Sequence, residues 1–155
     1  MAGERPAGRD SEARIERLRP LLRRAGLALT AQRRAILHAV LDHDEHPTAD
    51  RVYALLRQRR VRASRATVFR TLESLARLGV VTKASHPGVA VRYDGRGERH
   101  HHLVCVRCDR IVDFADEALD AVSVPDTRRL GFRVLDLQVE LRGICRLCRE
   151  QEDRT

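Results

Sequence analysis

Aromatic residues are almost missing from this sequence: they make up 3% of its 155 residues, and tryptophan is absent. Hydrophobic residues nevertheless account for 43% of the chain, a normal level for a globular protein. The core must therefore consist mainly of leucine, valine, isoleucine and alanine. The length suits one ordinary domain, or two small domains that share a core.

Long hydrophobic runs are also lacking, and none approaches the ~18 residues of a membrane span. No membrane partner is therefore expected. The first residues, MAGERPAGRDSEAR, are charged and lack the apolar segment of a secretory signal, so residues 1–10 are predicted to be a disordered tail. We expect a cytoplasmic protein, in which thiols stay reduced.

Negative charge is scarce in the first half of the chain. Residues 1–80 contain 17 arginines against 9 acidic residues, whereas residues 81–155 contain 13 basic and 13 acidic residues. The whole formal charge of +8 therefore belongs to the first half. An arginine-rich proteome would raise the charge everywhere, so the asymmetry favours a polyanion-binding module joined to a neutral one.

Hydrophobic periodicity and capping residues predict four helices and a hairpin in this basic half. The expected helices cover residues 11–25, 31–43, 49–60 and 65–78, and the last three begin after Thr30, Thr48 and Ser64. Two short β-branched runs within residues 80–94 surround a turn at His86, Pro87 and Gly88. This order matches a winged helix-turn-helix domain over residues 11–94.

The helix that follows Ser64 would be the recognition helix, which enters the major groove of double-stranded DNA. Arginines at its N-terminal end can reach guanine edges or phosphates. Any single arginine there can equally serve only to solvate the outer face of the helix. The predicted DNA-binding residues are Arg33, Ser64, Arg65, Thr67, Phe69 and Arg70.

Residues 95–98 form a polar, glycine-containing hinge, and the pattern then changes to short strands. Strands are expected at residues 100–106, 110–114 and 132–141, with a helix near 116–130 and a short helix from about Cys145. The predicted fold class is α+β, with residues 99–155 as a small α/β domain built on a three-stranded antiparallel sheet. Open sheet edges and a modest core indicate a homodimerisation domain.

All four cysteines belong to two C-x-x-C pairs, Cys105 with Cys108 and Cys145 with Cys148, separated by 36 residues. Two such pairs can supply four thiolates to a structural zinc ion at ~2.3 Å. The alternatives are buried free thiols or a redox-active disulfide pair. Because no cysteine is left over, we favour structural Zn(2+), which would supply folding free energy to a small domain.

The histidines form a separate set. On a strand, His100 and His102 share one face while His101 points to the other, with Cys105. Asp94 at the end of the hairpin and Asp113 on the next strand can come near the histidine pair. The remaining histidines divide into a candidate ligand, His46, two expected surface residues, His38 and His43, and a turn residue, His86.

Seven motifs together resemble the ferric uptake regulator superfamily: LRRAGLALTAQRRAIL, HPTADRVY, SRATVFRTL, VRYD, HHHLVCVRC, IVDF and GFRV followed by LRGICRLC. They occur in the family's order and cover roughly Ile15 to Glu150. The sequence is most similar to the peroxide-responsive repressor branch, which carries His-Pro-Thr-Ala-Asp, an Asp two residues after the wing arginine, His-x-His and Ile-Val-Asp-Phe.

This resemblance implies a transcriptional repressor rather than an enzyme, acting as a homodimer on an inverted-repeat operator. It also implies a regulatory site for Fe(2+) or Mn(2+) made of His46, Asp94, His100, His102 and Asp113. One ion would fix the orientation of the two domains and so couple metal binding to DNA binding. Hydrogen peroxide would oxidise His46 or His100 and release the operator.

Three residues depart from the family pattern. Phe69 replaces the usual Tyr, Asp109 replaces a Gly after the first cysteine pair, and Leu137 replaces a ligand His, which disfavours a third site on His101 and Asp120. The main alternative is an iron-, manganese- or zinc-homeostasis regulator of the same superfamily. Others are a metalloenzyme that uses the His/Asp cluster and a zinc-ribbon interaction module without a DNA role.

Overall fold

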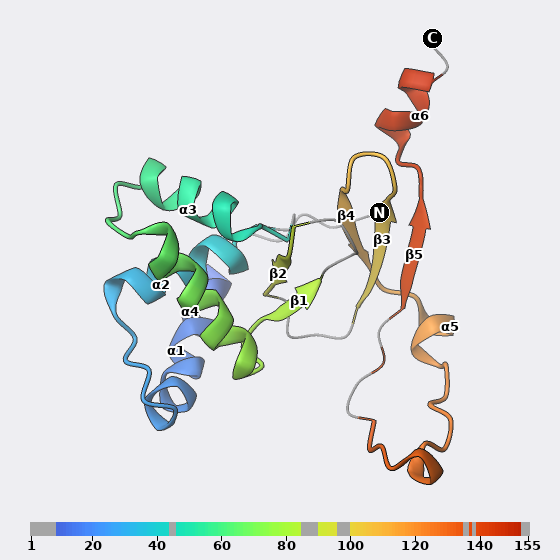
Figure 1. Ribbon diagram of the computed structural model, residues 1–155, viewed down its shortest axis with the longest axis horizontal. Helices are drawn as coiled ribbons and strands as arrows, with labels where there is room; N and C mark the ends of the chain where they lie inside the picture. Colours follow the sequence, from blue (N-terminus) through green and yellow to red (C-terminus); the bar gives the residue numbers. More distant parts are fainter. Residues whose placement is uncertain are drawn as a thin grey trace. The chain divides into compact units, whose positions relative to one another are not determined.

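The computed structural model describes residues 9–43, 46–84, 90–95, 100–134, 137 and 139–152. The chain divides into two compact units, residues 1–97 and 98–155 (Figure 1). The first unit contains α1 (Arg9–Arg24), α2 (Ala31–Leu41), α3 (Ala49–Gln58), α4 (Arg65–Arg77), β1 (Thr82–Ala84) and β2 (Arg92–Asp94). The second contains β3 (His101–Cys105), β4 (Ile111–Phe114), α5 (Glu117–Asp120), η1 (Arg128–Leu130), β5 (Glu140–Gly143) and α6 (Arg146–Glu152).

Side-chain caps start three of the helices in the first unit. The hydroxyls of Thr30, Thr48 and Ser64 accept hydrogen bonds from the backbone N–H three residues later, which satisfies donors that a helix leaves open at its N-terminus. The three predicted helix starts are therefore confirmed. Helix α1 begins at Arg9, two residues earlier than predicted, so its first two residues belong to the expected tail; residues 1–8 lie outside the described residues.

Aliphatic side chains from all four helices form the core of the first unit, as the composition predicts. The wing adds Val80, Val81 and Tyr93 to this core. Strands β1 and β2 pair antiparallel, with Thr82 opposite Asp94. The predicted hairpin is confirmed, while its turn at residues 86–88 lies outside the described residues. Helices α3 and α4 followed by this wing make a winged helix-turn-helix unit.

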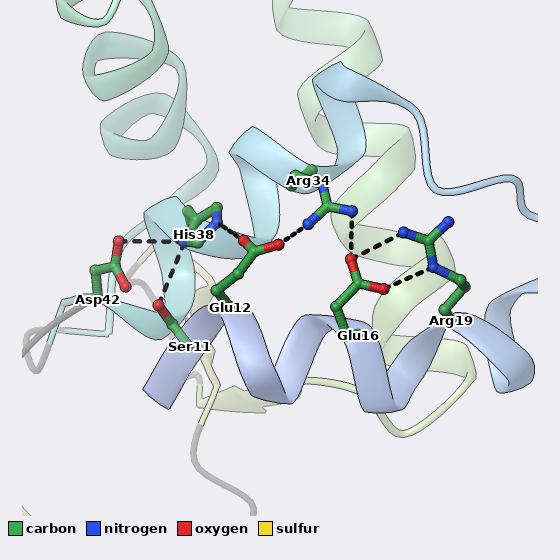
Figure 2. Close-up of polar contacts among 7 residues, drawn as sticks. All are labelled: Ser11, Glu12, Glu16, Arg19, Arg34, His38 and Asp42. Atoms are coloured by element: carbon green, nitrogen blue, oxygen red, sulfur yellow. Dashed lines mark hydrogen bonds and ion pairs between the residues drawn. The ribbon is translucent and has the colours of Figure 1, made fainter. Parts of the chain in front are cut away.

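A charged network fastens α1 to α2 (Figure 2). His38 Nε2 lies 2.7 Å from Glu12 Oε2, and Arg34 binds both Glu12 and Glu16. The sequence placed His38 at the surface; in the structure its side chain is half-buried and contacts Ser11 and Glu12 of α1. The network is completed by Ser11, Arg19 and Asp42.

The second unit is built on a three-stranded sheet in the order β4-β3-β5 (Figure 1). Strand β4 is antiparallel to β3, but β5 is parallel to it. The α+β class is confirmed, whereas the expectation of a purely antiparallel sheet is wrong. A parallel neighbour requires a crossover connection, which the chain between β4 and β5 provides.

That crossover contains less regular structure than predicted. The expected helix near 116–130 shrinks to Glu117–Asp120 and one 3-10 turn at Arg128–Leu130. Pro125 lacks the N–H that a continuing helix would use, and the Asp126 carboxylate accepts from the Arg128 N–H, which forms a separate turn. The predicted strand at 132–141 is also too early, since β5 begins at Glu140.

One row of apolar side chains crosses the sheet of the second unit. Leu103 lies opposite Val112 on one side and Leu141 on the other, and each of the three is 42–43% exposed.

Among the helices that the structure describes, none combines the length and the apolar character needed to cross a membrane.

Candidate metal centres and nucleic-acid interface

Four cysteine sulfurs converge at one end of the sheet in the second unit. All four lie within 4.8 Å of one another, with 3.8 Å between Cys105 and Cys148 and 3.7 Å between Cys108 and Cys145. A tetrahedral zinc ion with ~2.3 Å bonds to sulfur would place its ligands about 3.8 Å apart. The four cysteines are free thiols, so the arrangement fits a closed zinc site better than a disulfide pair.

The parallel direction of β5 explains how the two cysteine pairs meet. Strand β3 ends at Cys105 and β5 ends at Gly143, two residues before Cys145. Because the strands run the same way, both pairs emerge at the same end of the sheet. The turn after Cys108 places Asp109 at φ 56°, a left-handed conformation that Asp adopts more readily than most residues, so the Asp in place of Gly still closes the turn.

Backbone hydrogen bonding prepares this site for a cation. The Cys145 N–H donates to Cys105 Sγ at 3.3 Å, and this bond contributes most to lowering the pKa of the Cys105 thiol to about 6. The hydrogen bond with the Cys145 side chain, together with burial, raises the pKa of Cys148 to about 12. Sulfurs this close cannot all be thiolates unless a cation neutralises them.

A second cluster of the same unit contains only nitrogen and oxygen donors. His100 Nε2 and His102 Nε2 lie 3.1 Å apart, and Asp113 Oδ1 lies 3.5 Å from His102 Nε2 and 3.9 Å from His100 Nε2. Both histidines are buried. The shared face of the histidine pair is confirmed, and the pairing of His102 with Asp113 across β3 and β4 explains the position of the carboxylate.

The first unit holds two further predicted ligands close together. His46 Nε2 lies 3.7 Å from Asp94 Oδ1, and both side chains are buried. His46 has a φ of 47°, an uncommon conformation for a non-glycine residue. Its carbonyl accepts a hydrogen bond from Arg92 Nη1 at 3.3 Å, and Thr82 donates to Asp94 Oδ2 at 3.2 Å. Side chains of the wing therefore hold the backbone of His46 and the carboxylate of Asp94.

His101 has a different environment from the histidines on either side of it. It is fully buried, its Nε2 lies 3.2 Å from Asp120 Oδ1, and its Nδ1 accepts from the Val139 N–H at 3.3 Å. Its ring also packs against Phe114. These contacts connect β3 to α5 and to the segment before β5, which gives His101 a structural role that the sequence did not reveal.

The predicted DNA-binding residues of α4 divide into two groups. Ser64 and Thr67 hydrogen-bond to each other at the start of α4, so they cap the N-terminus of this helix. Arg65, Phe69 and Arg70 are exposed, and Phe69 is 53% exposed although it is a large apolar residue. Arg65 also pairs with Asp50 at 3.0 Å and lies over the Tyr53 ring. From α2, the Arg33 guanidinium donates to the Ala28 carbonyl.

An open groove of about 580 Å³ adjoins the start of α4 and adds arginines that the sequence reasoning missed. Its lining includes Arg57, Arg60 and Arg62 together with Gln32, Tyr53 and Ser64. The signal for it was the run RQRRVR at residues 57–62, but which of these arginines face the groove depends on how the chain turns between α3 and α4. Arg60, at φ 56°, lies in that turn.

A winged helix-turn-helix unit joined to a sheet unit with a four-cysteine centre defines a class of metal-binding winged-helix proteins. The chain belongs to the ferric uptake regulator family, whose model matches residues 24–142.

Named relatives from both branches of the family are similar to this chain. It is 32% identical over 130 residues to the peroxide-responsive repressor PerR of Staphylococcus epidermidis, covering 84% of this chain and 87% of the relative. It is 35% identical over 146 residues to the ferric uptake regulation protein of Bacillus subtilis, covering 91% and 98%.

Among solved structures, the Helicobacter pylori ferric uptake regulator Fur, described with three functional metal binding sites, has the same fold. It superimposes with a TM-score of 0.75 at 20% identity, over 94% of this chain and 97% of that one. The family consists of metal-dependent transcriptional regulators, and both a peroxide-responsive repressor and a ferric uptake regulation protein resemble this chain.

Proposed function

We propose that this protein is a metal-dependent transcriptional repressor that binds an inverted-repeat DNA operator as a homodimer and releases it when hydrogen peroxide oxidises a ligand histidine. The observation that carries this proposal is the presence of two chemically different donor sets in one unit. A thiolate set and an all-nitrogen-and-oxygen set have no ligand in common, so they can hold different ions and serve different purposes.

The thiolate set suits a permanent ion. Four cysteines form the closed, tetrahedral arrangement of structural Zn(2+), and the sulfur separations of 3.7 and 3.8 Å support it. This ion would fix the turn after β3 to the segment after β5. In the reduced environment of the cytoplasm, which we propose as the location, the cysteines remain available as zinc ligands rather than as disulfides.

The second set suits an exchangeable ion. His100, His102 and Asp113 offer imidazole and carboxylate ligands. These ligands are harder than thiolate and suit Fe(2+) or Mn(2+). We infer that His46 and Asp94 of the first unit complete the same site. In support, each unit already brings its own ligands together: 3.7 Å separates His46 from Asp94, and 3.1 Å separates the two histidines of the pair.

An ion bound by ligands from both units would restrict the orientations that the DNA-binding unit can adopt. In a dimer, this restriction sets the spacing between two recognition helices and therefore the fit to two half-sites. Metal affinity and DNA affinity must then rise together, because coupling between two ligands is reciprocal. The exposed Arg65, Phe69 and Arg70 of α4 and the arginine-lined groove beside it support DNA as the partner.

The sheet of the second unit supports the dimer. Leu103, Val112 and Leu141 form an exposed apolar row across all three strands. An apolar groove of about 200 Å³ lined in part by Leu103, Val112 and Ile144 lies beside this row. Covering such a surface with a second copy removes apolar area from water, and the two-fold arrangement uses the same patch on both chains.

The sensing step would be a two-electron oxidation. One oxygen atom passes from hydrogen peroxide into a ring C–H bond of His46 or His100, and the peroxide is reduced to water. Bound Fe(2+) supplies the redox chemistry. The chain holds the two imidazoles at the ion, and oxidation of either ring lowers its ability to remain a ligand. Each molecule reacts once, so the event is a signal and not turnover.

Mass spectrometry of the Fe(2+)-loaded protein after brief peroxide treatment tests this proposal. Trypsin should release residues 35–51, which contain His38, His43 and His46, and residues 100–107, which contain all three histidines of the triplet. We expect a gain of one oxygen atom, placed on His46 or His100 by fragmentation. The other histidines of each peptide act as internal controls.

Two samples control this experiment. The variant His102→Ala should lose the site and show no oxygen gain, while the Zn(2+)-loaded protein should also stay unmodified, since zinc has no redox chemistry. If the Fe(2+)-loaded protein gains no oxygen but still binds DNA in a metal-dependent way, peroxide sensing is wrong. The second candidate, an iron-, manganese- or zinc-homeostasis regulator, would then hold; the 35% identity to the Bacillus subtilis protein favours it.

A further inference from the structure

Strand β2 connects the predicted metal ligands of the first unit to several other elements. Its residues Arg92, Tyr93 and Asp94 make different contacts. Arg92 donates to the His46 carbonyl, the Tyr93 N–H donates to the Pro47 carbonyl at 3.0 Å, and Asp94 faces His46. A change at the His46–Asp94 pair must therefore act on β2.

Tyr93 extends this connection to the recognition helix. Its ring is fully buried in the core, and its hydroxyl donates to Glu73 Oε1 on α4 at 2.9 Å. The residue directly before the ligand Asp94 is thus hydrogen-bonded to the helix that carries Phe69 and Arg70.

Glu73 has a second partner that allows the contact to be separated from general stability. Lys83 Nζ on β1 lies 2.7 Å from Glu73 Oε2 at a partly exposed position. The same carboxylate therefore binds one buried residue of the ligand-bearing strand and one residue of the neighbouring strand. When either donor is removed, the other still binds the Glu73 carboxylate, so neither change leaves this carboxylate without a hydrogen-bond partner.

We propose that Tyr93 is a positioning residue of the metal switch, whose hydrogen bond to Glu73 couples occupancy of the His46–Asp94 pair to the position of α4. This inference rests on the proposed function, since it requires metal to increase DNA affinity. Asp94, once held as a ligand, would displace its neighbour Tyr93 on β2, and the hydrogen bond from Tyr93 to Glu73 would pass this displacement to α4. Such coupling needs a physical element that both sites bias.

The test compares operator binding by the full-length protein with and without Mn(2+), at one fixed salt concentration. For the unmodified protein we expect Mn(2+) to strengthen binding. In Tyr93→Phe we expect this stimulation ratio to fall by about 2- to 30-fold, the range for residues along a coupling route. Metal-free binding should change much less than metal-stimulated binding. Lys83→Gln is the matched control and should keep the ratio of the unmodified protein.

A second pair of variants covers the case in which Tyr93→Phe does not fold. Glu73→Gln retains an oxygen that accepts from Tyr93 and should keep the ratio, whereas Glu73→Ala removes the acceptor and should lower it. An unchanged ratio in Tyr93→Phe or in Glu73→Ala overturns the inference, and so does an equal loss of affinity with and without metal. A ratio of one in the unmodified protein overturns the proposed function first, and the inference with it.

Discussion

At the scale of single residues, the two candidate metal centres differ in how their proposed ligands are prepared. The Cys105 thiol has its pKa lowered to about 6, mainly by the hydrogen bond from the Cys145 N–H, so part of the site favours thiolate before metal arrives. At the other centre, His46 adopts a left-handed backbone conformation and has its carbonyl held by Arg92. The first centre is therefore prepared by a lowered thiol pKa, and the second by the backbone conformation of one residue.

Replacing Cys105 with Ser tests the thiolate centre. Structural zinc contributes about 10–16 kcal/mol in small domains, and loss of one of four ligands removes most of that contribution. We expect zinc content, measured by elemental analysis after gel filtration, to fall from about one ion per chain to nearly none, with a clear loss of thermal stability. Val106→Ala, which alters the exposed neighbour, should keep the zinc; a stable, zinc-loaded Cys105→Ser protein would refute the assignment.

At the scale of secondary-structure elements, α1 is held by charge as well as by its apolar face. Ile15 and Leu22 enter the core, while Glu12 and Glu16 reach across to Arg34 on α2 (Figure 2). Ion pairs at partly exposed positions are worth little individually and are screened by salt. A network in which one arginine bridges two carboxylates is the case in which they contribute measurably.

Replacing Arg34 with Met should therefore destabilise the first unit in a salt-dependent way. We expect a melting temperature a few degrees lower than that of the unmodified protein in dilute buffer, because Glu12 and Glu16 then repel each other without a bridging cation. The difference should shrink in 1 M salt, where the Debye length is about 3 Å. Arg23→Met, at an exposed position of α1, serves as the control. Equal destabilisation at both salt concentrations would show that packing, and not charge, holds the helix.

At the scale of the whole molecule, the apolar row of the second unit determines the assembly we propose. Leu103 lies at the centre of that row, between Val112 and Leu141. Its side chain is 42% exposed in the single chain, and a symmetric interface would count its contribution twice. A charge at this position affects both copies at once.

Leu103→Glu should therefore dissociate the dimer. The lost apolar contact alone amounts to about 1–3 kcal/mol per dimer, or roughly a 5- to 150-fold weaker association, and burying two carboxylates adds to it. Analytical ultracentrifugation should show a monomer that keeps its zinc. Val91→Glu, an exposed apolar position of the first unit, should remain dimeric. A Leu103→Glu dimer of unchanged affinity would place the interface elsewhere.

Local signals predicted more of this molecule than long-range ones did. Capping hydroxyls such as Thr48 and the alternation of His100 and His102 follow from neighbouring residues alone, and the structure confirms both. The direction of β5 and the contacts of His38 depend on how distant segments pack, which no short window of sequence contains. The helix expected near 116–130 is short in the structure, because Pro125 cannot continue a helix.

The parallel pairing of β5 with β3 has a consequence for synthesis on the ribosome. Cys145 follows Cys105 by 40 residues, so at ~5–20 residues per second the first cysteine pair waits about 2–8 s for the second. During that interval β3, later the central strand, is an edge strand with unpaired backbone groups. Such edges promote aggregation. A nascent chain starved of zinc would therefore be expected to accumulate as aggregates joined through β3, and not as a soluble, metal-free regulator.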